Sequence, residues 1–140
     1  MLKLNSTGLE FEDTIIDKFY NVCIKEWGTN SFKISTVKQD LYAGTDFFVL
    51  GVPVDVTLNI TDKNHTTISK TTIDIGFAKI NFAVRYGNGR VKFDTPVLVI
   101  GFDTLMDKTG IRQLASFLDP MQVVELIQAG MDCYFETVEI

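Results

Sequence analysis

Three carboxylates stand in segments of the chain that are otherwise apolar. Asp46 and Asp55 lie within residues 44–57, GTDFFVLGVPVDVT, which has the pattern of two apolar strands joined by a turn at Gly51-Val52-Pro53. Glu12 falls on the apolar side of a helical pattern, which is an unusual place for a carboxylate. Two carboxylates held at neighbouring strand positions repel each other unless they share a cation or a proton. The sequence therefore predicts a cation-binding site formed by these side chains.

Magnesium or manganese is the cofactor that these residues suit, because Mg²⁺ takes one or two carboxylates and completes its shell with water and phosphate oxygens. The turn would place Asp46 opposite Asp55, and Thr57 shares a face with Asp55 because side chains two apart on a strand point the same way. We expect Asp46 and Asp55 to be the metal ligands and Glu12 to support them.

The same residues also have a purely structural explanation. An aspartate beside a turn often accepts hydrogen bonds from backbone N–H groups. Asp55 could lie on a solvated face of the sheet, and the Glu12 carboxylate could reach solvent at the edge of its helix. The sequence leaves both explanations open.

A definite order of elements must position these side chains. A helix is expected over residues 7–27, with an apolar stripe along one side. Strands are expected at 31–37, 45–50, 52–61, 66–73 and 97–102, and helices at 74–86, 109–118 and 121–130. The segment 77–86, FAKINFAVRY, also fits a strand. This order predicts one α/β domain over residues 1–140, with a central mixed β-sheet flanked by helices.

The strand expected at 52–61 alternates between apolar and polar residues. Its apolar side chains should face the core: Val54, Val56, Leu58 and Ile60. Asp55 and Thr57 then lie on the opposite face.

The composition is that of a soluble globular protein. The net charge is −5, so the chain is a poor nonspecific binder of nucleic acid unless a basic patch or a bound metal reverses the charge locally. Cys23 and Cys133 match no metal or redox spacing and are expected to be buried thiols in a reducing cytoplasm. The N-terminus has no signal-peptide pattern, and the longest apolar run, residues 96–102, is too short to span a bilayer. We expect a cytoplasmic protein that does not contact a membrane.

The pattern resembles the PD-(D/E)XK superfamily of restriction-endonuclease-like phosphodiesterases. In that family a helix carries an acid, a strand carries the first aspartate, and the next strand carries (D/E)-x-K. The stretches EFED, GTDFFVLGVPVDVT and PVLVIGF are similar to this order over residues 8–102, although the motif itself is only a few residues. The resemblance implies a restriction-endonuclease-like fold and Mg²⁺-dependent cleavage of DNA. Glu12 matches the helix acid, Asp46 the first aspartate and Asp55 the acid of the pair.

The chain departs from this family at Thr57, where the family carries a lysine. That lysine is thought to position the attacking water and to stabilise the charge that develops on the phosphate, which threonine cannot do. Some members carry the lysine elsewhere, often on a neighbouring helix. Lys79, in FAKINFAVR, is the best candidate here, with Arg85 behind it, and Lys70 on the short polar strand is another. The resemblance thus implies either a nuclease or a degenerate site that binds magnesium and hardly hydrolyses anything. The catalytic residues of the nuclease would be Glu12, Asp46, Asp55 and Lys79.

A second function on the same scaffold is a noncatalytic acidic binding protein. Small single-domain proteins that resemble this superfamily occur in phages and mobile elements. There, an acidic binder would bind the basic surface of a host defence or nucleic-acid-binding protein and inhibit it. The net charge and Thr57 favour the binder, whereas the three carboxylates favour the nuclease. The expected partner is accordingly DNA or a basic protein, and no oligomeric state is predicted.

Overall fold

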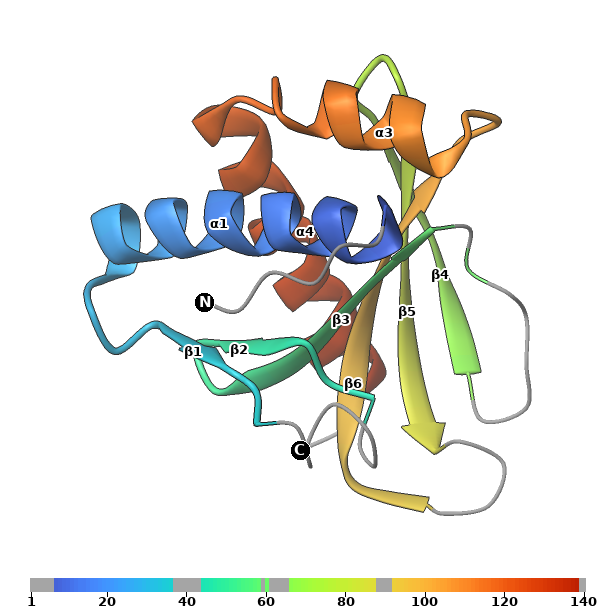
Figure 1. Cartoon of the computed structure of the whole chain (residues 1–140). Coiled ribbons are helices and arrows are strands. Elements are labelled where there is room, and N and C mark those ends of the chain that lie inside the picture. Colours follow the sequence, from blue (N-terminus) through green and yellow to red (C-terminus); the bar gives the residue numbers. More distant parts are fainter. Residues whose placement is uncertain (1–6, 37–43, 59, 61–65, 88–91, 139–140) are drawn as a thin grey trace.

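The computed structural model describes residues 7–36, 44–58, 60, 66–87 and 92–138. Along the chain its elements are α1 (Thr7–Trp27), β1 (Phe32–Ile34), β2 (Phe47–Val49), β3 (Val52–Leu58), β4 (Thr66–Asp74), β5 (Lys79–Gly87), β6 (Lys92–Asp103), α3 (Lys108–Ala115) and α4 (Pro120–Thr137). The strands form one sheet in the order β1-β2-β3-β6-β5-β4 (Figure 1). β3 and β6 are parallel, and the other neighbours are antiparallel. The prediction of an α/β fold with a mixed sheet is confirmed.

β2 and β3 form a tight hairpin. Val49 pairs with Val52, and the two residues between them, Leu50 and Gly51, have positive φ angles of 50° and 84°. Two residues with positive φ give the turn geometry that matches the twist of antiparallel strands. The antiparallel pairing is therefore as predicted. The turn, however, is Leu50-Gly51 and not Gly51-Val52-Pro53, because Val52 already begins β3.

The prediction of a helix at 74–86 is wrong, because this segment forms the end of β4, a turn and β5. Its large buried side chains recur every second residue, which is the period of a strand: Ile80, Phe82 and Val84. Asp74, at the start of the helix expected over 74–86, instead accepts a hydrogen bond from the Gly76 N–H at 2.8 Å. Gly76 has a φ of +96°, which supports the turn into β5.

The helices pack on one face of the sheet. Phe11 of α1 lies edge-on against Phe102, with ring centroids 5.3 Å apart, and Gly130 of α4 lies against Phe82 and Leu98. The register of the strands places these three sheet residues on the same face. Figure 1 shows α1 crossing the upper part of the sheet, with α3 above it and α4 behind it. No helix in the described ranges is long and apolar enough to cross a membrane.

The core prediction for β3 holds for part of the strand. Val54 and Val56 are buried under the helices, and Leu58 packs at the edge of the same cluster. Ile60 is not in this core, because the strand ends at Leu58 and the Ile60 side chain packs over Gly101. A Cβ at position 101 would collide with Ile60, so glycine is required for this packing.

Cys23 and Cys133 are buried free thiols, as expected. Burial raises the pKa of the Cys23 thiol to about 11. The Cys23 sulfur is therefore not poised for nucleophilic chemistry.

Shortening a side chain on either face of β3 should have unequal effects on the free energy of unfolding. Val56→Ala removes buried methyl groups and should lower the free energy of unfolding by about 2 kcal/mol. Thr57→Ala removes a half-buried side chain on the other face and should cost much less. Urea unfolding of both variants measures the difference. Equal losses would contradict the assignment of the two faces.

Candidate carboxylate site

Asp46 and Asp55 come together at the open end of the β2–β3 hairpin. Asp46 immediately precedes β2, and its N–H donates to the Val54 carbonyl at 2.8 Å, so it lies across from Asp55 in β3. Asp46 is 9% exposed, and the Asp55 side chain is 19% exposed. The two carboxyl groups are within hydrogen-bonding reach of each other, which requires that they share a proton.

Asp46 also has a structural role. β2 begins only at Phe47, so within the described ranges the backbone of β3 beyond Asp55 has no strand partner on that side. The Asp46 Oδ2 atom accepts the Val56 N–H at 2.8 Å and satisfies this buried donor. The structural explanation of Asp46 is therefore correct in part, but this bond uses only one of its two carboxyl oxygens.

The environment of Asp46 disfavours its charged form. Burial is the largest cause, and the neighbouring Asp55 and Glu12 carboxylates add to it, against the lowering effect of the Val56 N–H. Together they raise the pKa of Asp46 from 3.8 to about 9. At neutral pH Asp46 therefore holds a proton, and a cation at this site would take the place of that proton.

Arg85 on β5 supplies the positive charge at this site. Its Nη1 lies 3.1 Å from the Asp55 Oδ2, and its side chain is 25% exposed. Arg85 pairs with Val97 of β6, and Asp55 pairs with Val99, so the guanidinium reaches across β6 over the face opposite the helices. The guanidinium balances the negative charge of Asp55.

Glu12 is half-buried on α1 and lies near enough to Asp46 to raise its pKa. The structure does not bring Lys79 to these carboxylates. Lys79 pairs with Asp103, four residues along β6 from the partner of Asp55. Lys79 is thus about 13 Å along the strands and about 10 Å across them from Asp55, beyond the reach of a lysine side chain.

Thr57 lies next to Asp55 on the same face of β3. Its partner on β6 is Gly101, and its hydroxyl donates to the Leu58 carbonyl at 3.4 Å. This contact is local and long, so Thr57 takes no part in binding the Asp55 carboxylate. The position is close to the site but carries no charge.

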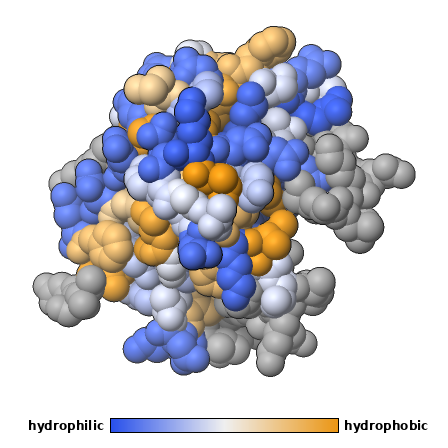
Figure 2. Space-filling view, turned by 90° about the vertical axis from the view of Figure 1, so that its left-hand side faces the viewer, coloured by the Kyte–Doolittle hydropathy of each residue, from blue (hydrophilic) through white to orange (hydrophobic). Residues whose placement is uncertain are grey.

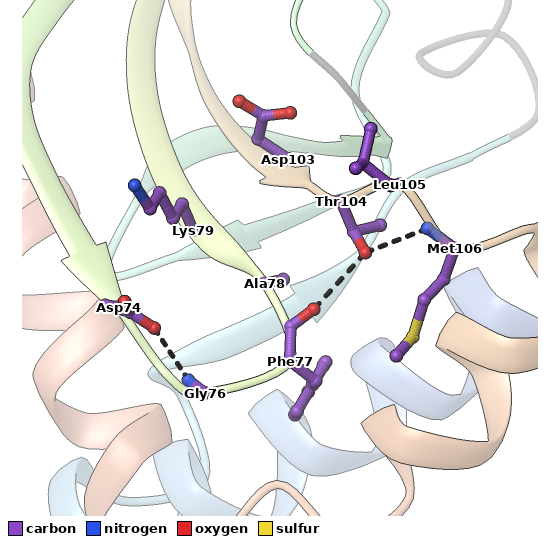
Figure 3. Close-up of a pocket in the computed structure, with 9 residues that line it drawn as sticks. All are labelled: Asp74, Gly76, Phe77, Ala78, Lys79, Asp103, Thr104, Leu105 and Met106. Carbon is purple, nitrogen blue, oxygen red and sulfur yellow. Dashed lines mark hydrogen bonds between the residues drawn. The ribbon is translucent and has the colours of Figure 1, made fainter.

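Lys79 instead lines a separate surface pocket of about 540 Å³ between the β4–β5 turn and the loop after β6 (Figure 3). Lys79 stands between Asp74 and Asp103 in one row across three strands. The Thr104 hydroxyl ties the two loops together, donating to the Phe77 carbonyl at 3.2 Å and accepting from the Met106 N–H at 3.1 Å. The pocket therefore has mixed charge and belongs to the far end of the sheet.

The donor set at the site is small. No group of three or more His, Cys, Asp or Glu side chains in the described ranges could hold a metal ion together. Two neighbouring carboxylates remain, and Mg²⁺ is often held by one or two carboxylates with water and phosphate oxygens. The residues fit such an ion only if the shared proton leaves and Arg85 gives way at Asp55.

Comparison with protein-family models, with curated proteins and with solved structures finds no match to this chain. The fold and the geometry of Asp46, Asp55 and Arg85 are consequently the basis for any functional argument.

Proposed function

We propose that the protein is a DNA-directed, nuclease-like phosphodiesterase whose Asp46–Asp55 site binds Mg²⁺ or Mn²⁺, with slow turnover. The observation that carries the proposal is the buried Asp46 carboxyl facing Asp55 at the edge of a hairpin. Such an arrangement destabilises the folded protein unless a proton or a cation neutralises it, and strongly perturbed carboxyl groups concentrate at functional sites.

Each residue at the site has a distinct part in this proposal. Asp46 and Asp55 would hold the cation, and Glu12 would strengthen the negative potential that attracts it. A bound divalent cation supplies charge stabilisation for a phosphate and an activated water. Arg85 lies beside Asp55, where a guanidinium suits a phosphate oxygen.

Slow turnover follows from the residues around β3. Thr57 stands beside Asp55 without a charge, and Lys79 lies at the other end of the sheet. A preorganised positive charge at a phosphoryl group is among the largest contributions to catalysis. Thr57 stands where the lysine would be and Arg85 is paired with Asp55, so binding of cation and DNA should exceed cleavage by a wide margin.

A noncatalytic acidic binder remains the second candidate, favoured by exposed apolar side chains. Phe117 is 79% exposed, Met121 is 73% exposed and Leu105 is fully exposed, in a chain with a net charge of −5. The partner would be a basic protein, such as a host defence or nucleic-acid-binding protein in the cytoplasm. Figure 2 shows one face of the molecule, on which apolar side chains lie in separate spots among hydrophilic ones. The second candidate rests on these exposed residues and the net charge alone, and it has less support than the first.

The first test is a thermal shift with Mn²⁺. The wild type should be stabilised by Mn²⁺, by about 2.7 kcal/mol at a hundredfold excess over Kd, because the ion binds only the folded protein. Asp55→Asn should lose this shift. Asp103→Asn removes the same charge from an exposed aspartate elsewhere on the sheet and should retain it. Equal shifts in both variants would reject the site.

Cleavage is measured on linear duplex DNA with Mn²⁺ and with EDTA. Slow, metal-dependent cutting that Asp55→Asn abolishes would support the phosphodiesterase. If Mn²⁺ neither binds nor promotes any cutting, the acidic binder is the better explanation.

A further inference from the structure

The Arg85–Asp55 ion pair occupies the place where a cation would bind. The guanidinium Nη1 is 3.1 Å from Asp55 Oδ2, and both side chains are largely buried. The backbone ahead of Asp46 also passes close to this guanidinium: a Cβ on Gly44 would lie 3.8 Å from Nη1 and 4.0 Å from the Phe93 ring. These are ordinary contact distances, and the φ of +58° at Gly44 is what favours glycine at this position.

We propose that Arg85 is an internal counter-ion that a divalent cation displaces from Asp55, so that the freed guanidinium binds a phosphate of DNA and the two ligands bind cooperatively. The inference rests on the proposed function, because it requires a cation at Asp46 and Asp55. Beyond that function, the inference gives a mechanism by which cation binding controls DNA binding.

A divalent cation and the Arg85 guanidinium would compete for the Asp55 carboxylate. A cation and a guanidinium repel each other, so a divalent cation held by the Asp55 carboxylate weakens the contact of Arg85 with Oδ2 and favours its release. When the cation binds Asp55, Arg85 loses its partner while remaining three-quarters buried. A partly buried charge without a partner is costly, so a new anion at this place is favoured.

Phosphate is the anion that a guanidinium suits best, because its planar N–H groups bind two phosphate oxygens at once. Without the cation, Arg85 is neutralised by Asp55 and the chain carries a net charge of −5, which repels DNA. Because the divalent cation replaces the shared proton, its binding adds one net positive charge and frees the Arg85 guanidinium. By linkage, DNA must strengthen cation binding by the same factor as the cation strengthens DNA binding.

The experiment compares wild type, Arg85→Gln and Lys79→Gln. The two variants have the same net charge, and Lys79 lies on the same face of the sheet as Arg85 but six residues away along β5. Calorimetry measures the Kd of Mn²⁺, and fluorescence anisotropy measures the Kd of a short duplex DNA with and without Mn²⁺. Gel analysis confirms that the DNA is intact when it is measured.

We expect Arg85→Gln to bind Mn²⁺ about tenfold more tightly than wild type, because the competing charge is gone. Mn²⁺ should tighten DNA binding about tenfold or more in wild type and in Lys79→Gln, and clearly less in Arg85→Gln. Arg85→Lys should restore part of the cooperativity, because it keeps the charge without the planar pair of donors.

Two different failures can be told apart. If wild type binds Mn²⁺ but Arg85→Gln binds it no more tightly, or if both gain equally in DNA affinity, the counter-ion role is wrong and the cation site stands. If neither wild type nor Arg85→Gln binds Mn²⁺, the proposed function fails and this inference fails with it.

Discussion

Asp46→Asn should raise the free energy of unfolding on the order of 4 kcal/mol at pH 7, because the wild type folds around a carboxyl whose pKa is raised from 3.8 to about 9. The asparagine amide oxygen can still accept the Val56 N–H, and its amide group can donate to Asp55 as the protonated carboxyl does. The gain follows because the unfolded wild type ionises freely at pH 7, whereas the folded protein must keep the proton.

The raised pKa of Asp46 sets the direction in which its contribution to the free energy of unfolding changes with pH. A carboxyl with a raised pKa binds more protons in the folded than in the unfolded protein, so its contribution is most favourable below about pH 4 and is lost as the pH rises to about 9. Urea unfolding at pH 5, 7 and 9 should show a difference between Asp46→Asn and wild type that grows with pH. The exposed Asp103→Asn variant is the control. A difference that is the same at every pH would contradict a buried protonated Asp46.

The hairpin that carries both aspartates could be predicted because its signals are local. Residues 52–58 alternate between apolar and polar, and a short turn must separate them from the preceding apolar strand. Those two facts alone place Asp46 near Asp55. The observed turn begins at Leu50, one residue before the predicted one. Leucine is uncommon at a positive φ, so the sequence carries no turn signal at this position.

The segment 74–86 could not be assigned by the same reasoning. Its apolar residues fit both a helical and a strand period, because Ala83 is buried on the face opposite Ile80 and Phe82. On a strand, Arg85 shares a face with Ala83, and the pairing with β6 brings it to Asp55. This pairing depends on contacts between residues far apart in the chain, so the sequence favoured Lys79 over Arg85 as the cation near the site.

Thr57→Lys should raise DNA cleavage with Mg²⁺ by about 10²–10³-fold over a slow wild type, which is the size of effect that one preorganised charge has on developing negative charge. Position 57 suits this change, because it follows Asp55 by two residues on the same face of β3, away from the helices. The new ammonium would thus stand beside the carboxylates and within reach of a bound phosphate.

The control for this gain is Asn81→Lys, which adds the same charge to the same face of the sheet. Asn81 pairs with Gly101 from the other side, so it lies in the same row as Thr57 but two strands from β3. Both variants should bind DNA more tightly because each adds a positive charge. Only Thr57→Lys should raise kcat, and Asp55→Asn in the same chain should remove the gain because the cation is then lost. Equal rates in Thr57→Lys and Asn81→Lys, measured on saturating duplex DNA, would show that charge near the carboxylates does not limit cleavage, and that the site binds without a latent capacity for hydrolysis.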